Sequence, residues 1–118
     1  MMLALAVVVL LCGLLVADLS LYLGARARAQ VAADAAALAA APVTFRPFGA
    51  AGSAADEARR FAARNGATLI ECRCAPDPTW RSRAVMVHVS VSADLVLFGV
   101  TEATAWSSAE FDPTRLGR

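Results

Sequence analysis

Residues 1–41 read MMLALAVVVLLCGLLVADLSLYLGARARAQVAADAAALAAA and decide how the rest of the chain is interpreted. They hold no charge before Asp18, and the first proline of the chain is Pro42. A secretory signal would end in a small-residue cleavage site and then change in character. Residues 1–41 show no such change, because helix-forming residues continue through the whole segment. We therefore expect one continuous helix of about 60 Å, at a rise of about 1.5 Å per residue. Its first half suits lipid, and its alanine-rich second half suits close contact with protein.

The composition of the whole chain agrees with a membrane segment. Of its 118 residues 58% are hydrophobic, and the mean hydropathy is +0.57. Soluble domains are usually about 45–50% apolar. The net charge is +1 and the 11 basic residues, all arginine, form no basic stripe along the sequence. We therefore expect no contact with nucleic acid.

Asp18 is the one charged residue within the apolar run. About 20 apolar residues span a bilayer. An aspartate at the centre of a spanning helix costs about 2.5–3.5 kcal/mol on insertion scales. The sequence therefore places Asp18 either toward one membrane interface or against a neighbouring helix.

A second interpretation treats the apolar run as a signal peptide. Ala27, Arg28 and Ala29 resemble an A-x-A cleavage site. Cleavage near Ala29 would release a small secreted α+β binding module. Against this, the first residues carry no lysine or arginine, and the helical pattern continues through the proposed cut.

Polar residues follow one line along the alanine-rich segment. Arg26, Gln30 and Asp34 are spaced four residues apart, and Leu38 continues the line. Such residues are neighbours on a helix surface. The other positions are almost all alanine, with Val31, and small side chains let helix backbones approach closely. We expect either a plain stalk or a surface that packs on other subunits. The candidate assembly residues are Asp18, Arg26, Gln30, Asp34 and Leu38.

Beyond the helix the sequence predicts a small α+β domain. The expected organisation is a membrane and stalk helix over 1–41, a linker loop over 42–53 in which Phe45 and Phe48 are candidate anchors, a domain over 54–112 and a tail over 113–118. Ser53 and Gly66 bracket a short helix as its N-terminal cap and C-terminal stop. Strict alternation over 84–93 predicts a strand with one buried valine face, and 68–72 and 100–111 are two further strands. The fold class is thus α+β, with a long helix, a short helix and an antiparallel sheet of about three strands.

Chemistry-bearing residues are few. Cys72 and Cys74 form a C-x-C pair that is a candidate for oxidation outside the cytoplasm, within the pair or to a partner. His88 is expected on a solvent-facing strand position; an alternative set of metal ligands would join it to the two cysteines. No phosphate-binding loop or nucleophile motif occurs. We therefore expect no enzyme, no cofactor, no metal and no small-molecule substrate.

Several segments resemble a known family. VADLSLYLGARAR followed by AQVAADAAALAAA is similar to the N-terminal region of the TadE/TadG-like proteins of tight-adherence (Flp) pilus assembly. The downstream EARRFAARNGATLIEC and the valine strand resemble the secretion- or DNA-translocation-related TadE-like proteins of high-GC Gram-positive bacteria. The resemblance extends to about residue 92.

The resemblance implies a single-pass minor pilin or pseudopilin with a type IV pilin-like layout. Its helix would be held in the cell membrane and its C-terminal domain would lie outside the cytoplasm, with incorporation into an extracellular filament as a further possibility. Its partners would be other pilin-like subunits and membrane components of the assembly apparatus.

Overall fold

The computed structural model describes residues 1–45 and 52–117, so the predicted anchor Phe48 lies outside the described residues. It confirms the α+β class with one long helix, one short helix and a three-stranded antiparallel sheet. The elements are α1 (Met2–Val43), α2 (Ala54–Arg64), β1 (Thr68–Arg73), β2 (Arg83–Leu95), β3 (Gly99–Phe111) and a final 3-10 helix, η2 (Pro113–Gly117). Residues 113–117, expected as a tail, therefore form a helical turn in which Pro113 is buried.

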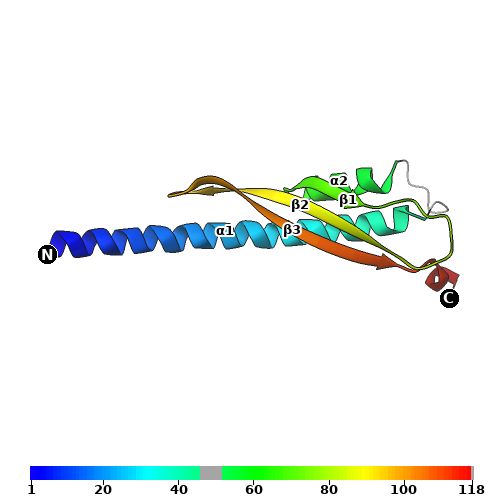
Figure 1. The fold of residues 1–118 in the computed structure, drawn as a ribbon, viewed down its shortest axis with the longest axis horizontal. Helices are drawn as coiled ribbons and strands as arrows, with labels where there is room; N and C mark the ends of the chain where they lie inside the picture. The colour runs from blue at the N-terminus through cyan, green and yellow to red at the C-terminus, as the bar shows by residue number, and fades with distance from the viewer. Residues whose placement is uncertain (46–51, 118) are drawn as a thin grey trace.

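Helix α1 runs almost the whole length of a molecule that measures 73 × 24 × 17 Å (Figure 1). It is uninterrupted from Met2 to Val43 and so ends two residues beyond residue 41, the end expected from the sequence, with Pro42 inside its last turn. Proline removes its own N–H from the helix and its ring crowds the carbonyl four residues earlier, so the helix continues only one residue beyond Pro42. Thr44 then closes the end, because its N–H and its hydroxyl both donate to the Ala41 carbonyl.

The sheet has the order β1-β2-β3, and its two long strands form an extended hairpin. β2 and β3 pair along their full length, from Arg83 opposite Phe111 to Leu95 opposite Gly99. β1 is shorter and pairs only with the segment 86–90 of β2, with a register shift between Leu69 and Glu71. The far half of the hairpin is therefore a two-stranded ribbon that continues past β1 along α1 (Figure 1). Two strands alone are marginally stable in water, so this ribbon depends on the helix beneath it.

The core lies between α1 and the inner face of the sheet. The valines of β2 are buried as the alternation predicts: Val85, Val87, Val89 and Val91. β3 presents small residues to the same side at Ala103, Ala105 and Ala109, and the facing part of α1 is alanine. Short side chains on both surfaces let helix and sheet approach closely. The buried alanines of α1 are Ala25, Ala29, Ala32, Ala33, Ala36, Ala37, Ala40 and Ala41.

Helix α2 packs beside α1 and β1 through three alanines, Ala54, Ala58 and Ala62. Its N-terminus carries the predicted cap. The Asp56 N–H donates to the Ser53 hydroxyl at 3.1 Å, and the Ser53 N–H donates to the Asp56 carboxylate at 3.4 Å. These bonds from Ser53 hold the pKa of Asp56 below its ordinary value. Gly66 follows the helix with φ at 74°, a left-handed conformation that glycine adopts without strain.

Candidate assembly surface and membrane contact

Asp18 is bound inside its own chain. Asp18 is only 3% exposed, although it lies within the apolar run. One carboxylate oxygen accepts the Val96 N–H at 2.6 Å, and the other accepts the Leu97 N–H at 2.8 Å. Both donors belong to the turn between β2 and β3, so the Asp18 carboxylate holds this turn against α1. In the structure Asp18 therefore contacts a turn of its own chain, and its position relative to a membrane interface or a neighbouring helix stays a prediction.

The turn that Asp18 holds is strongly apolar. Val96, Leu97, Phe98 and Val100 are all exposed, with Phe98 68% and Val100 73% accessible. We call residues 96–100 the hairpin tip. No sequence motif marks the tip as a partner of Asp18. A cluster of four large apolar residues around a turn glycine is nevertheless unusual, because turns normally carry polar residues.

Gln30 and Asp34 also bind the chain's own sheet. The Gln30 amide donates to the Asp34 carboxylate at 3.0 Å and to the Trp106 carbonyl at 3.3 Å. The Ser107 hydroxyl donates to the same Asp34 oxygen at 2.5 Å. These two candidate assembly residues therefore fasten α1 to β3, and sequence reasoning did not identify their partners Trp106 and Ser107.

The alanine surface of α1 is occupied as well. Its buried alanines pack on β2, β3 and α2 of the same chain.

The side of α1 turned away from the sheet remains accessible. We call it the outer stripe; it comprises Ala27, Val31 and Leu38, with Val31 60% and Leu38 68% exposed. The two remaining candidate residues, Arg26 and Leu38, are exposed. Val31 and Leu38 are the two large apolar residues of the alanine-rich segment, so the sequence itself could have indicated this exposed apolar stripe.

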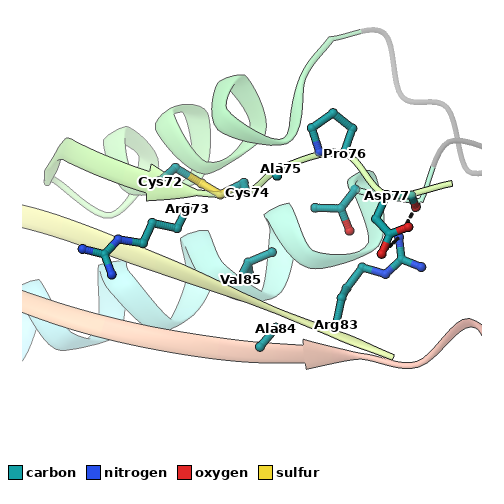
Figure 2. A pocket seen from close by; sticks show the side chains of 10 residues that line it. Cys72, Arg73, Cys74, Ala75, Pro76, Asp77, Arg83, Ala84 and Val85 are labelled. Carbon is teal, nitrogen blue, oxygen red and sulfur yellow. Dashed lines mark hydrogen bonds and ion pairs between the residues drawn. A yellow bond between two sulfur atoms is a disulfide. The ribbon is translucent and has the colours of Figure 1, made fainter. Parts of the chain in front are cut away.

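The cysteine pair and His88 lie on opposite faces of the sheet. Cys72 and Cys74 are joined by a disulfide and pack against the core (Figure 2). Cys72 pairs across the strand with the buried Val87, whereas His88 stacks on Trp106 of the outer face with 4.1 Å between ring centroids. The alternative set of metal ligands is therefore not assembled. Within residues 1–45 and 52–117 no three His, Cys, Asp or Glu side chains gather to hold a metal ion.

A hollow beside the disulfide is lined by the segment 72–77, Thr44 and the start of β2 (Figure 2). One of its three charged residues, Arg83, donates to the carbonyls of Asp77, Thr79 and Arg81; the others are Arg73 and Asp77. Hydrogen bonds from Thr79 lower the pKa of Asp77. The predicted anchor Phe45 is buried below Arg83 and meets Trp80 edge-on at 5.0 Å. Arg83 thus holds the loop that forms one wall of the hollow, and these hydrogen bonds are a structural role for the residue.

The disulfide closes a very short loop, and its removal should therefore cost little. We expect replacement of Cys72 and Cys74 together by serine to lower the free energy of unfolding by about 1–2 kcal/mol on chain-entropy grounds. Chemical denaturation of the purified chain measures the change, with Cys12→Ala as the control for loss of an unrelated thiol. Failure of the double variant to fold would show that the disulfide has a larger role.

The geometry defines the class of protein to which this layout belongs. Among the described residues α1 is the one helix long and apolar enough to cross a membrane, and its first 17 residues are covered by nothing else in the structure. The same helix continues as a structural part of a small α+β domain. This is the layout of a membrane-anchored protein with an aqueous domain.

Comparison with known proteins agrees with that class. Residues 1–42 match the family described as putative Flp pilus-assembly TadE/G-like. This confirms the resemblance to TadE/TadG-like pilus-assembly proteins over almost all of α1. No curated protein and no solved structure matches the chain. The family match and the long apolar helix together fit a membrane-anchored component of pilus assembly.

Proposed function

We propose that this chain is a pilin-like structural subunit, a minor pilin or pseudopilin, of a tight-adherence-type pilus assembly or secretion apparatus. The observation that carries the proposal is the continuity of α1. One helix supplies the apolar span, the segment that matches the pilus-assembly family and half of the core of the aqueous domain. A force or displacement at the span is thereby transmitted directly to the domain.

Two sets of contacts make the helix and the domain one body. Asp18 holds the hairpin tip at the level of the span. Nearer the C-terminal end of α1, Gln30 and Asp34 form hydrogen bonds to β3. The buried alanines fill the interface between α1 and the sheet. The span therefore cannot tilt independently of the domain, a property that suits a subunit whose orientation is set by neighbouring helices.

The contacts of α1 also weigh against the secreted alternative. Cleavage near Ala29 would remove Asp18, Tyr22 and Ala25, which lie against the far half of the hairpin. The buried side chains Val91, Ala93 and Ala103 would lose part of their cover. A two-stranded ribbon without a supporting layer is marginally stable. The fold is thus consistent with retention of the apolar helix.

In this proposal the domain lies outside the cytoplasm and the outer stripe faces other pilin-like subunits. Ala27, Val31 and Leu38 are exposed, and the small side chain of Ala27 permits close approach of a second helix at that level. The buried alanine surface cannot serve this purpose because its own sheet covers it.

Cysteine crosslinking tests the proposal. Val31→Cys and Leu38→Cys, each in a Cys12→Ala background, would be produced together with the rest of the apparatus in its native membrane. We expect a bifunctional thiol reagent to join both variants to other subunits. Thr104→Cys, exposed on the opposite side of the molecule, is the matched control and should remain uncrosslinked. Monomer alone at Val31 and Leu38, or equal crosslinking at Thr104, would contradict the proposal.

A further inference from the structure

The hairpin tip lies level with a part of α1 that belongs in the bilayer. The apolar run extends from Met2 to Gly24, and Arg26 follows it. A span needs about 20 residues. Any such stretch placed between Met2 and Gly24 contains Asp18. The carboxylate then lies about 5–9 Å inside the hydrocarbon boundary, at a rise of about 1.5 Å per residue. Since Asp18 binds Val96 and Leu97 directly, the tip shares that depth.

The side chains of the tip suit this environment. Val96, Leu97, Phe98 and Val100 are exposed and apolar, and together they would be costly to keep in water. On α1 at the same level Leu19, Leu21 and Leu23 are exposed too. These apolar side chains come from two elements joined by the bonds of Asp18. The bilayer that surrounds the span would therefore meet the tip without any further partner.

The backbone of the tip is prepared for the same environment. Irregular backbone is excluded from lipid unless its polar groups have partners inside the protein. Val96 and Leu97 are turn residues whose N–H groups are bound by the two oxygens of Asp18. Conversely, a buried carboxylate is tolerable when it accepts hydrogen bonds. The Asp18 carboxylate gives the two N–H groups an acceptor, and the N–H groups give the carboxylate its donors. These hydrogen bonds lower the cost of placing both below the membrane surface.

We propose that the hairpin tip inserts into the lipid leaflet beside α1, as a second membrane contact of this chain. The proposal rests on the anchoring of α1 under the proposed function. The charges on the hairpin limit the depth. Asp94 lies three residues before Leu97, which corresponds to about 10 Å along a strand. Insertion to the level of Asp18 therefore leaves Asp94 near the boundary and Glu102 well outside it.

Site-directed spin labelling of the full chain tests the proposal. Phe98→Cys and Val100→Cys, in a Cys12→Ala background, carry a nitroxide in vesicles of phosphatidylethanolamine and phosphatidylglycerol. Power saturation compares collisions with oxygen, which concentrates in lipid, and with a nickel chelate, which stays in water. Leu15→Cys in the span and Thr104→Cys on the outer sheet face are the lipid and water references. Both tip positions are already exposed, so these substitutions should leave the fold intact.

We expect the Phe98→Cys label to resemble Leu15→Cys, with high access to oxygen and loss of access to nickel. The Val100→Cys label, which pairs with Asp94 near the boundary, should lie between the lipid and water references. Tip labels that resemble Thr104→Cys while Leu15→Cys reports lipid would overturn the insertion and leave the anchor standing. Labels shielded from both reagents would also overturn it, because a protein surface would then cover the tip. A water-like signal at Leu15→Cys would overturn the anchoring itself.

Discussion

Replacing Asp18 with leucine will weaken the fold while making the apolar run more hydrophobic. The substitution leaves the N–H groups of Val96 and Leu97 without their acceptor. A hydrogen bond to a charged group contributes about 1.5–3 kcal/mol, so loss of the two predicts a decrease of about 2 kcal/mol or more in unfolding free energy. Chemical unfolding in detergent micelles measures the loss, and hydrogen exchange at residues 96 and 97 locates it.

Asp18→Asn is the matched variant for this prediction. Its amide keeps a carbonyl oxygen that accepts one N–H, so it should retain part of the stability and slow exchange at one of the two residues. A leucine variant as stable as the parent chain, with unchanged exchange at the tip, would show that Asp18 does not hold the hairpin.

Replacing Ala33 with leucine will open the interface between α1 and the sheet. Ala33 is fully buried in the cluster that contains Ala103 and Val89. Overpacking a close-packed core typically costs about 1–3 kcal/mol. Here the cost should reach the upper end of that range, since both surfaces are built of small residues and offer no flexible side chain that can move aside.

Ala27→Leu is the control, because Ala27 is exposed on the outer stripe of the same helix and both residues favour helix. Thermal unfolding of the two variants side by side should show a large loss for Ala33→Leu and almost none for Ala27→Leu. Equal losses would mean that the alanine surface is not the contact between helix and sheet.

The sequence predicted the elements well, because their signals are local. The length of α1 follows from an unbroken helix-forming segment, and β2 follows from valines at every second position. The end of α1 was predicted at residue 41, but the helix continues through Pro42 to Val43. Residues 113–117 were expected as a tail, but the hydrogen bonds of Thr114 to Asp112 begin a helical turn there.

The partners of the helix surface were beyond the reach of local patterns. A stripe of alanines indicates close packing but does not distinguish another subunit from the chain's own sheet. The alternating alanines of β3 were the complementary signal, at Ala103, Ala105 and Ala109. The partner of Asp18 had no signature at all, because backbone N–H groups are present at every residue except proline. The family match covers only 1–42, so the surfaces of the domain are known from geometry alone.

The central claim is that α1 is both a retained membrane anchor and part of the domain's core. Intact-mass analysis of the chain recovered from membrane and soluble fractions of its native cell tests this most directly. The account predicts a membrane-bound chain, resistant to alkaline extraction, that retains Asp18 and the apolar residues before it. A soluble chain that begins near Gln30 would contradict it, because the domain would then be stable without the helix segment that Asp18 ties to the hairpin.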